Sequence, residues 1–106
     1  MGDGDLLFEA RTPLGFVVRV NRSRWELIAN VKHPVMAGCE ASVRLALEQP
    51  DEIRQSRSDF EVLLFYRTEA AQRWVCAVAK RTLRDAFLIT AYPTDAIKEG
   101  TRIWPK

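Results

Sequence analysis

Apolar and polar residues alternate along residues 6–20 in the way expected of a β-hairpin. Two β-prone runs flank Pro13–Gly15, where the proline and the glycine supply the backbone angles of a tight turn. In the second run Phe16, Val18 and Val20 fall on one side of the predicted strand. We expect that side to be buried.

A first helix is predicted over residues 23–33, where the apolar residues take helical spacing. Ser23 and Glu26 have the spacing of a capping box, in which each side chain satisfies a backbone N–H group of the first turn. Pro34 disfavours helical dihedral angles at His33, so the helix should end there. The stripe expected to face inward consists of Trp25, Ile28 and Ala29, with Leu27 and Val31 on its flank.

A second helix is predicted over residues 39–49, and Pro50 ends it. Its inward face consists of Cys39, Val43, Ala46 and Leu47. The polar sequence that follows predicts a connection with a brief edge strand around Ile53.

Three strands are predicted at residues 59–67, 73–81 and 85–92, and their short connections indicate an antiparallel meander. The most compact pairing gives one wholly apolar face, on which we expect the helices to pack. This face consists of Phe60, Val62, Leu64, Val75, Ala77, Ala79, Phe87, Ile89 and Ala91.

The other predicted face is mixed. Its middle consists of Leu63, Phe65, Cys76, Val78 and Leu88. One end gathers Arg67, Trp74, Thr90 and Tyr92, and the other end holds Glu61 and Lys80. The pattern as a whole predicts an α+β fold over residues 1–106 as a single domain, with an N-terminal hairpin and two helices packed on an antiparallel β-sheet.

Composition and charge add little to this prediction. The chain has 106 residues, 47% of them hydrophobic, and a net charge of +2. This charge neither requires nor excludes the binding of nucleic acid. No apolar run approaches the ~20 residues of a membrane-spanning helix, and the N-terminal sequence MGDGDLLFEA is acidic where a signal peptide would be basic. The two cysteines, Cys39 and Cys76, are expected to be free thiols in a reducing compartment. We therefore expect a cytoplasmic protein with no membrane partner.

The cluster at one end of the mixed face has a plausible joint use. The guanidinium of Arg67 suits a phosphate, the ring of Trp74 suits stacking on a base, and the hydroxyls of Thr90 and Tyr92 suit hydrogen bonds to oxygens. The structural alternative is that Trp74 and Tyr92 only cover the rim of the sheet while Arg67 is solvated.

His33, in the stretch NVKHPVMAG, is the only histidine of the chain. The C-terminus of a helix carries partial negative charge, which favours the imidazolium form. A cationic histidine suits general acid catalysis or the binding of a phosphate. The structural alternative is a histidine that only bonds to the last carbonyl groups of the helix.

Metal-dependent chemistry has no supporting pattern. One histidine and two distant cysteines do not make a zinc site of recognised spacing. The sequence PDE at residues 50–52 resembles the start of a magnesium-dependent nuclease motif, but Lys80 follows Val78 and Ala79, so the acidic-x-lysine half is missing. No metal and no cofactor is expected.

Several motifs occur in a characteristic order: HP after a helix that contains tryptophan, then PDEI, LLFYR, a Val-x-Lys strand and FLITAYPTDAIKEG. In this order the chain resembles the small bacterial and phage domains of the barnase–EndoU–colicin–RelE nuclease superfamily, of the RelE-like toxin type, from about Gly15 to Trp104. The resemblance implies one or two helices followed by a four-stranded antiparallel sheet, and metal-independent cleavage of RNA by attack of the ribose 2′-hydroxyl on the adjacent phosphate.

The resemblance also implies roles for individual residues. His33 would be the acid or base, and Tyr92 and Thr90 would position the phosphate or transfer protons around it. Lys80 and Arg67 would stabilise developing negative charge, although the predicted register puts Lys80 and Tyr92 at opposite ends of the sheet. Further residues expected to bind substrate are Trp74, Arg54 and Ser56.

The sequence therefore predicts a metal-independent endoribonuclease that binds RNA, with a small antitoxin protein as the partner implied by the resemblance. The alternative is a non-catalytic module that binds RNA or a protein partner with the same end of the sheet.

Overall fold

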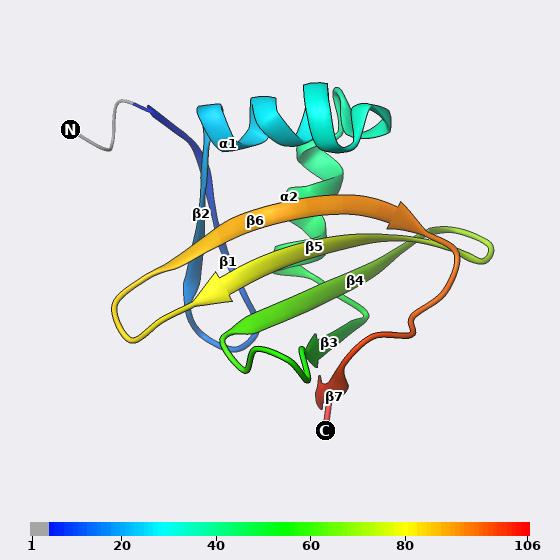
Figure 1. The fold of residues 1–106 in the computed structure, drawn as a ribbon. Coiled ribbons are helices and arrows are strands. Elements are labelled where there is room, and N and C mark those ends of the chain that lie inside the picture. The colour runs from blue at the N-terminus through cyan, green and yellow to red at the C-terminus, as the bar shows by residue number, and fades with distance from the viewer. Residues whose placement is uncertain (1–4) are drawn as a thin grey trace.

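A seven-stranded sheet with helices against one of its faces forms the centre of the computed structural model, which describes residues 5–106 (Figure 1). The first four residues of the acidic N-terminal segment lie outside this range. The elements in chain order are β1 (Leu6–Arg11), β2 (Val17–Asn21), α1 (Arg22–Leu27), the π-helical η2 (Ile28–Lys32), the short η3 (Pro34–Met36), α2 (Glu40–Glu48), β3 (Glu52–Gln55), β4 (Val62–Ala70), β5 (Arg73–Arg81), β6 (Ala86–Thr94) and β7 (Thr101–Trp104). The predicted α+β class is confirmed.

The strands lie in the order β1-β2-β6-β5-β4-β3-β7. The predicted hairpin forms, but β2 then pairs with β6 in parallel, at Arg19 and Phe87. The sheet is therefore mixed, whereas the sequence predicted an antiparallel one with the hairpin packed on it. The physical reason is that an isolated two-stranded hairpin is marginally stable, and joining the edge of β6 makes it part of a larger sheet.

The first helix begins at Arg22, immediately after β2. The predicted capping box does not form: the N-cap is Asn21, and the Ser23 hydroxyl instead donates a hydrogen bond to Asp5 Oδ2 at 2.8 Å. The helical stretch continues as η2 and ends where His33 leaves helical geometry at φ −141° and ψ 75°. The predicted end at His33 is confirmed, and Pro34 explains it.

The second helix, α2, lies within one residue of its predicted bounds and buries Val43, Ala46 and Leu47 against the sheet. The strand predicted around Ile53 also forms. It is not an edge strand, because β7, which the sequence pattern did not reveal, pairs with its outer side.

The register of β4 corrects the predicted faces of the sheet. Leu64 lies opposite Val78, whereas the sequence pattern placed Leu64 on the face of Ala77 and Ala79. A slip of one residue turns every side chain of a strand to the other face. Alternation could not set this register, because the four side chains of residues 63–66 are all buried.

The main core lies between the sheet and α2 and includes Leu63, Phe65, Val75, Ala77, Ala79, Leu88 and Ala91. Leu63, Phe65 and Leu88 were predicted for the opposite face. A second, smaller apolar cluster covers the face away from α2, here called the open face, and its buried members are Leu64, Tyr66, Cys76 and Val78. Five residues predicted to meet the helices do not. Val62, Leu64 and Ile89 belong to the open-face cluster, and Phe60 is 73% exposed. Phe87 lies opposite Lys80 on the open face, because the register between β5 and β6 shifts after Val78.

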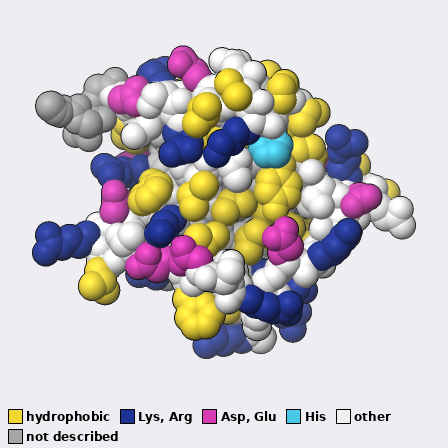
Figure 2. Space-filling model, viewed as in Figure 1, with side chains coloured by type: hydrophobic (Ala, Val, Ile, Leu, Met, Phe, Trp, Pro, Cys, Tyr) yellow, Lys and Arg dark blue, Asp and Glu magenta, His cyan; other side chains and the backbone are white. Residues whose placement is uncertain are grey.

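Figure 2 shows the open face, with apolar side chains at its centre and charged side chains around them. Both cysteines are free thiols, as predicted, with Cys76 buried and Cys39 partly buried. No helix among residues 5–106 is long and apolar enough to cross a membrane.

Candidate functional site

The side chains of His33 and Tyr92 meet at the edge of the open face. Their ring centroids are 5.6 Å apart, and the ring planes are inclined by 44°. The backbone N–H of His33 bonds to the Ile28 carbonyl at 2.8 Å, which holds the residue at the end of η2. In Figure 2 the single histidine lies beside the apolar centre of this face. The structure thus brings together two residues that the sequence analysis named for the same site.

Tyr92 belongs to a row of three polar side chains that crosses β4, β5 and β6. Tyr66 and Tyr92 lie directly opposite Cys76 from its two sides. Burial raises the pKa of the Cys76 thiol to about 12, although hydrogen bonding with the two phenols acts to lower it. Burial also raises the pKa of Tyr66 and of Tyr92 above the usual range, helped by the neighbouring thiol. All three groups therefore keep their protons near neutral pH, and the Tyr92 phenol acts as a hydrogen-bond donor.

A hollow of about 590 Å³ adjoins this row on the open face. It is lined by Ser56, Arg57, Ser58, Val62, Leu64, Val78, Tyr92, Lys98, Glu99 and Gly100. The strand residues give it an apolar floor, while the residues after β3 and those before β7 form two polar rims. Among residues 5–106, Arg57 and Lys98 form no ion pair. Arg57 donates a long hydrogen bond of 3.5 Å from its Nε to Thr101 Oγ1, so the charge of both cations remains available to an anionic ligand.

Ser56, which the sequence predicted to bind substrate, lines this hollow, and Arg54, predicted for the same role, bonds to Gly100 at its rim. The Ser56 hydroxyl accepts hydrogen bonds from the backbone N–H groups of Ser58 and Asp59 at 3.2 and 3.3 Å. Arg54 is already occupied: its Nε bonds to Glu52 Oε2 at 2.6 Å and its Nη1 to the Gly100 carbonyl at 3.2 Å. Arg54 therefore holds one rim of the hollow in place.

Arg67 does not belong to the site, which corrects its predicted grouping with Trp74, Thr90 and Tyr92. It lies opposite Val75 on the face covered by α2. Its Nη1 donates a hydrogen bond of 2.6 Å to the Gln49 carbonyl, at the C-terminal end of α2. The register slip in β4 explains the error, because it turns Arg67 away from the open face.

Trp74 and Thr90 lie on the open face, as predicted. Trp74 is partly buried against the open-face cluster, so it covers the rim of the sheet. Thr90 lies opposite Val78, and its hydroxyl is buried without a hydrogen-bond partner among the described residues.

Lys80 lies at the other end of the open face, as predicted. It is four residues along β5 from Cys76, which corresponds to about 13 Å of strand. Its ammonium group faces the carboxylates of Asp59 and Glu61 at 3.4 and 3.8 Å. Lys80 therefore does not share a site with Tyr92.

Sequence reasoning missed Tyr66, Arg57 and Lys98 as neighbours of Tyr92. Tyr66 could have been found by pairing the stretch LLFY with the strand around Cys76 in the correct register. The alternation of apolar and polar residues left that register ambiguous. Arg57 and Lys98 lie in connections without hydrophobic periodicity, so only the tertiary structure brings them to one hollow.

Among residues 5–106, no three His, Cys, Asp or Glu side chains lie close enough together to hold a metal ion. Comparison of the chain with protein-family models, with curated proteins and with solved structures finds no match.

Proposed function

We propose that this protein is a metal-independent endoribonuclease of the RelE-like type. The observation that carries the proposal is the contact of the only imidazole with a protonated phenol on the open face of the sheet. The antiparallel order β6-β5-β4-β3, with helices on one face only, supports the barnase/RelE-like arrangement that the sequence resemblance implies.

In this mechanism the ribose 2′-hydroxyl attacks the adjacent phosphorus and loses its proton. The bond to the 5′-oxygen of the next nucleotide then breaks, and that oxygen takes up a proton. The products are a 2′,3′-cyclic phosphate and a free 5′-hydroxyl. His33 either takes up the proton of the 2′-hydroxyl or protonates the leaving 5′-oxygen, because imidazole is the most frequent general acid or base of enzymes. Water accepts or supplies the proton of the other transfer. Tyr92 donates a hydrogen bond to the phosphate through its phenol O–H, which is protonated near neutral pH and whose pKa burial raises further.

The resemblance implied Lys80 and Arg67 as the cations that stabilise the transition state. One lies at the far end of the open face and the other on the opposite face of the sheet. In our proposal Arg57 and Lys98 take this role, because they line the same hollow as Tyr92. We also propose, following the resemblance, that a small antitoxin restrains the enzyme in the cytoplasm.

A non-catalytic RNA- or protein-binding module is the second candidate. The observation that favours it is that Arg54 and Lys80, both cations of the open face, are already paired with carboxylates. On this alternative the rings of His33 and Tyr92 serve only as a stacking surface.

The deciding experiment is the incubation of purified cellular RNA with the protein in EDTA, comparing wild type with His33→Ala. We expect cleavage by the wild type with 2′,3′-cyclic phosphate ends, and none by the variant. The thermal midpoint should change little, because the His33 ring is only partly buried and packs against the Tyr92 ring at the edge of the sheet. Failure of the folded wild type to cleave RNA, or undiminished cleavage by His33→Ala, would overturn the proposal.

A further inference from the structure

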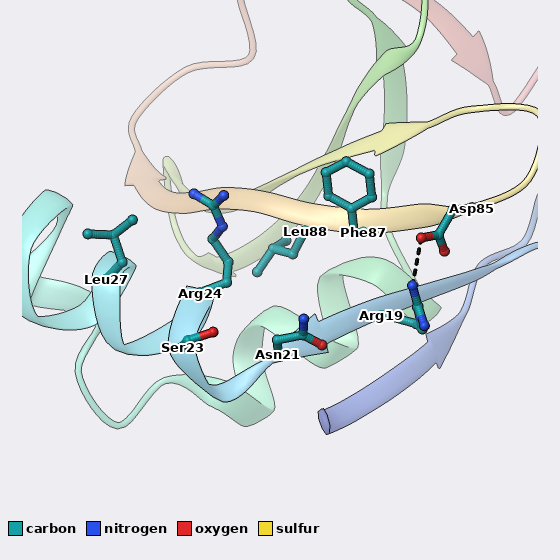
Figure 3. A pocket seen from close by; sticks show the side chains of 8 residues that line it. All are labelled: Arg19, Asn21, Ser23, Arg24, Leu27, Asp85, Phe87 and Leu88. Carbon is teal, nitrogen blue, oxygen red and sulfur yellow. Dashed lines mark hydrogen bonds and ion pairs between the residues drawn. The ribbon is translucent and has the colours of Figure 1, made fainter. Parts of the chain in front are cut away.

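A second cavity lies between α1, β2 and β6 and shares no lining residue with the hollow beside Tyr92. Its volume is about 440 Å³. Figure 3 shows the side chains that line it: Arg19, Asn21, Ser23, Arg24, Leu27, Asp85, Phe87 and Leu88. The cavity exists because β2 pairs with β6 only at Arg19 and Phe87 and then ends at Asn21, where the chain turns into α1.

The cavity has one aromatic wall. Phe87 lies opposite Lys80 and therefore on the open face, the same face as Tyr92. Its side chain is only partly buried. In Figure 3 the Phe87 ring and the Arg24 side chain extend past β6 on the same side, whereas Leu88 points the other way, into the core. An accessible aromatic ring at such a place suits stacking against a planar base.

The polar groups of the cavity divide into occupied and available ones. Arg19 Nη2 is bound to Asp85 Oδ2 at 2.6 Å, and the Ser23 hydroxyl donates to Asp5. Among residues 5–106, by contrast, Arg24 forms no ion pair and the Asn21 amide forms no hydrogen bond. A free guanidinium suits a phosphate, and a free amide, with donors and an acceptor, suits the edge of a base.

We propose that this cavity is a second RNA subsite, which binds one unstacked nucleotide of a single-stranded segment. The base lies on Phe87, the Asn21 amide bonds to its edge, and Arg24 contacts a phosphate. The volume falls within the range of small-ligand pockets, roughly 300–1,000 Å³. A duplex does not fit this arrangement, because its bases are stacked and their faces are covered.

That the ligand of this subsite is RNA rests on the proposed function. The position of the subsite relative to His33 and Tyr92 agrees with that function. Leu27 lines the cavity, and His33 follows it by six residues, at the end of η2. Along β6, Phe87 and Tyr92 are about 16 Å apart. One RNA strand on the open face therefore reaches both places, so a longer oligonucleotide should bind more tightly than a mononucleotide.

The test measures binding apart from cleavage. A fluorescein-labelled single-stranded oligoribonucleotide with methylated 2′-hydroxyls cannot undergo the reaction, and fluorescence anisotropy at one fixed ionic strength gives its Kd. We expect Arg24→Gln and Phe87→Leu each to raise the Kd at least about fivefold, because base stacking and charged contacts have energies of that order. A duplex of the same sequence should bind more weakly than the single strand.

Arg22→Gln is the matched control. Arg22 is exposed on the same helix and does not line the cavity, so its loss changes the net charge equally and should leave the Kd within about twofold. Equal effects of Arg22→Gln and Arg24→Gln would overturn the subsite, and so would a wild type that does not bind this RNA. If Phe87→Leu does not fold, the arginine pair still decides the question.

The two proposals can fail separately. Cleavage of RNA by the wild type, with unchanged binding by Arg24→Gln and Phe87→Leu, would remove the subsite and leave the nuclease. Binding that depends on Arg24 and Phe87, without any cleavage, would keep the subsite and assign the protein to the binding class.

Discussion

The imidazole of His33 and the phenol ring of Tyr92 lie 5.6 Å apart between centroids, one at the end of a helix and the other near the C-terminal end of β6. This contact depends on two local features. Pro34 ends the helical stretch at His33, and the antiparallel register places Tyr92 opposite Cys76, on the open face. The pair is therefore the point at which the proposed chemistry is most directly tested.

Removal of the Tyr92 hydroxyl should separate catalysis from stability. Tyr92→Phe should lower RNA cleavage at least about 100-fold, the usual effect of losing one hydrogen-bond donor to the charge that develops in the transition state. Tyr66→Phe is the control, because Tyr66 flanks the same thiol from the other side. The two variants should show similar losses of unfolding free energy in urea titrations, while only Tyr92→Phe loses activity. Equal activity in the two variants would contradict the role given to Tyr92.

Alkaline pH should destabilise the protein through the row Tyr66–Cys76–Tyr92. The pKa of Cys76 is raised from 9.0 to about 12 on folding, so the folded state holds its proton where the unfolded state releases it. The resulting stabilisation is complete below about pH 9 and is lost as the pH rises towards 12. The raised pKa values of Tyr66 and Tyr92 act in the same direction.

The measurement is the free energy of unfolding in urea between about pH 8 and about pH 11. The wild type should lose stability with pH more steeply than Cys76→Ala, which lacks the thiol. Parallel curves for the two proteins would show that the thiol does not contribute.

Arg67 should contribute to the stability of the fold and not to the cleavage of RNA. Arg67→Ala removes the hydrogen bond to the Gln49 carbonyl at the end of α2 and should cost about 1 kcal/mol of unfolding free energy. Cleavage should stay at the wild-type level, because Arg67 lies on the face covered by α2. Arg57→Ala, at the rim of the hollow, should have the opposite pattern, with reduced cleavage and little change in the thermal midpoint. A loss of cleavage in Arg67→Ala without a loss of stability would be inconsistent with the structure.

Gly100 should tolerate no side chain. Its φ is +83°, and a Cβ there would lie 2.7 Å from the Gln55 carbonyl oxygen. Gly100→Ala should therefore cost more than the ~1–2 kcal/mol of positive φ alone and should disturb the rim at Lys98 and Glu99. Gly38 has a similar φ of +81° with nothing within 4 Å of its Cβ position, so Gly38→Ala measures the conformational cost by itself. Equal destabilisation in chemical denaturation would rule out the steric contact.

Local sequence signals determined a large part of the fold. The spacing of Val43, Ala46 and Leu47 predicted the buried face of α2, and Pro34 predicted the end of the helical stretch at His33. The turn between β1 and β2 followed from proline and glycine in Pro13–Gly15. These features depend on residues within a few positions of one another in the chain. Their physical causes therefore act whatever the tertiary structure around them.

The tertiary structure alone decided which residues share a site. Residues 63–66 are apolar and buried on both faces, so no alternation marked which of them faces α2, and Arg67 was assigned to the wrong side with them. The sequence also did not predict the short pairing of β2 with β6 or the strand β7. Nor did it predict that Arg57, Lys98 and Tyr92 line one hollow. Each depends on contacts between segments far apart in the chain, whose register is set by the packing of the whole sheet and not by local preference.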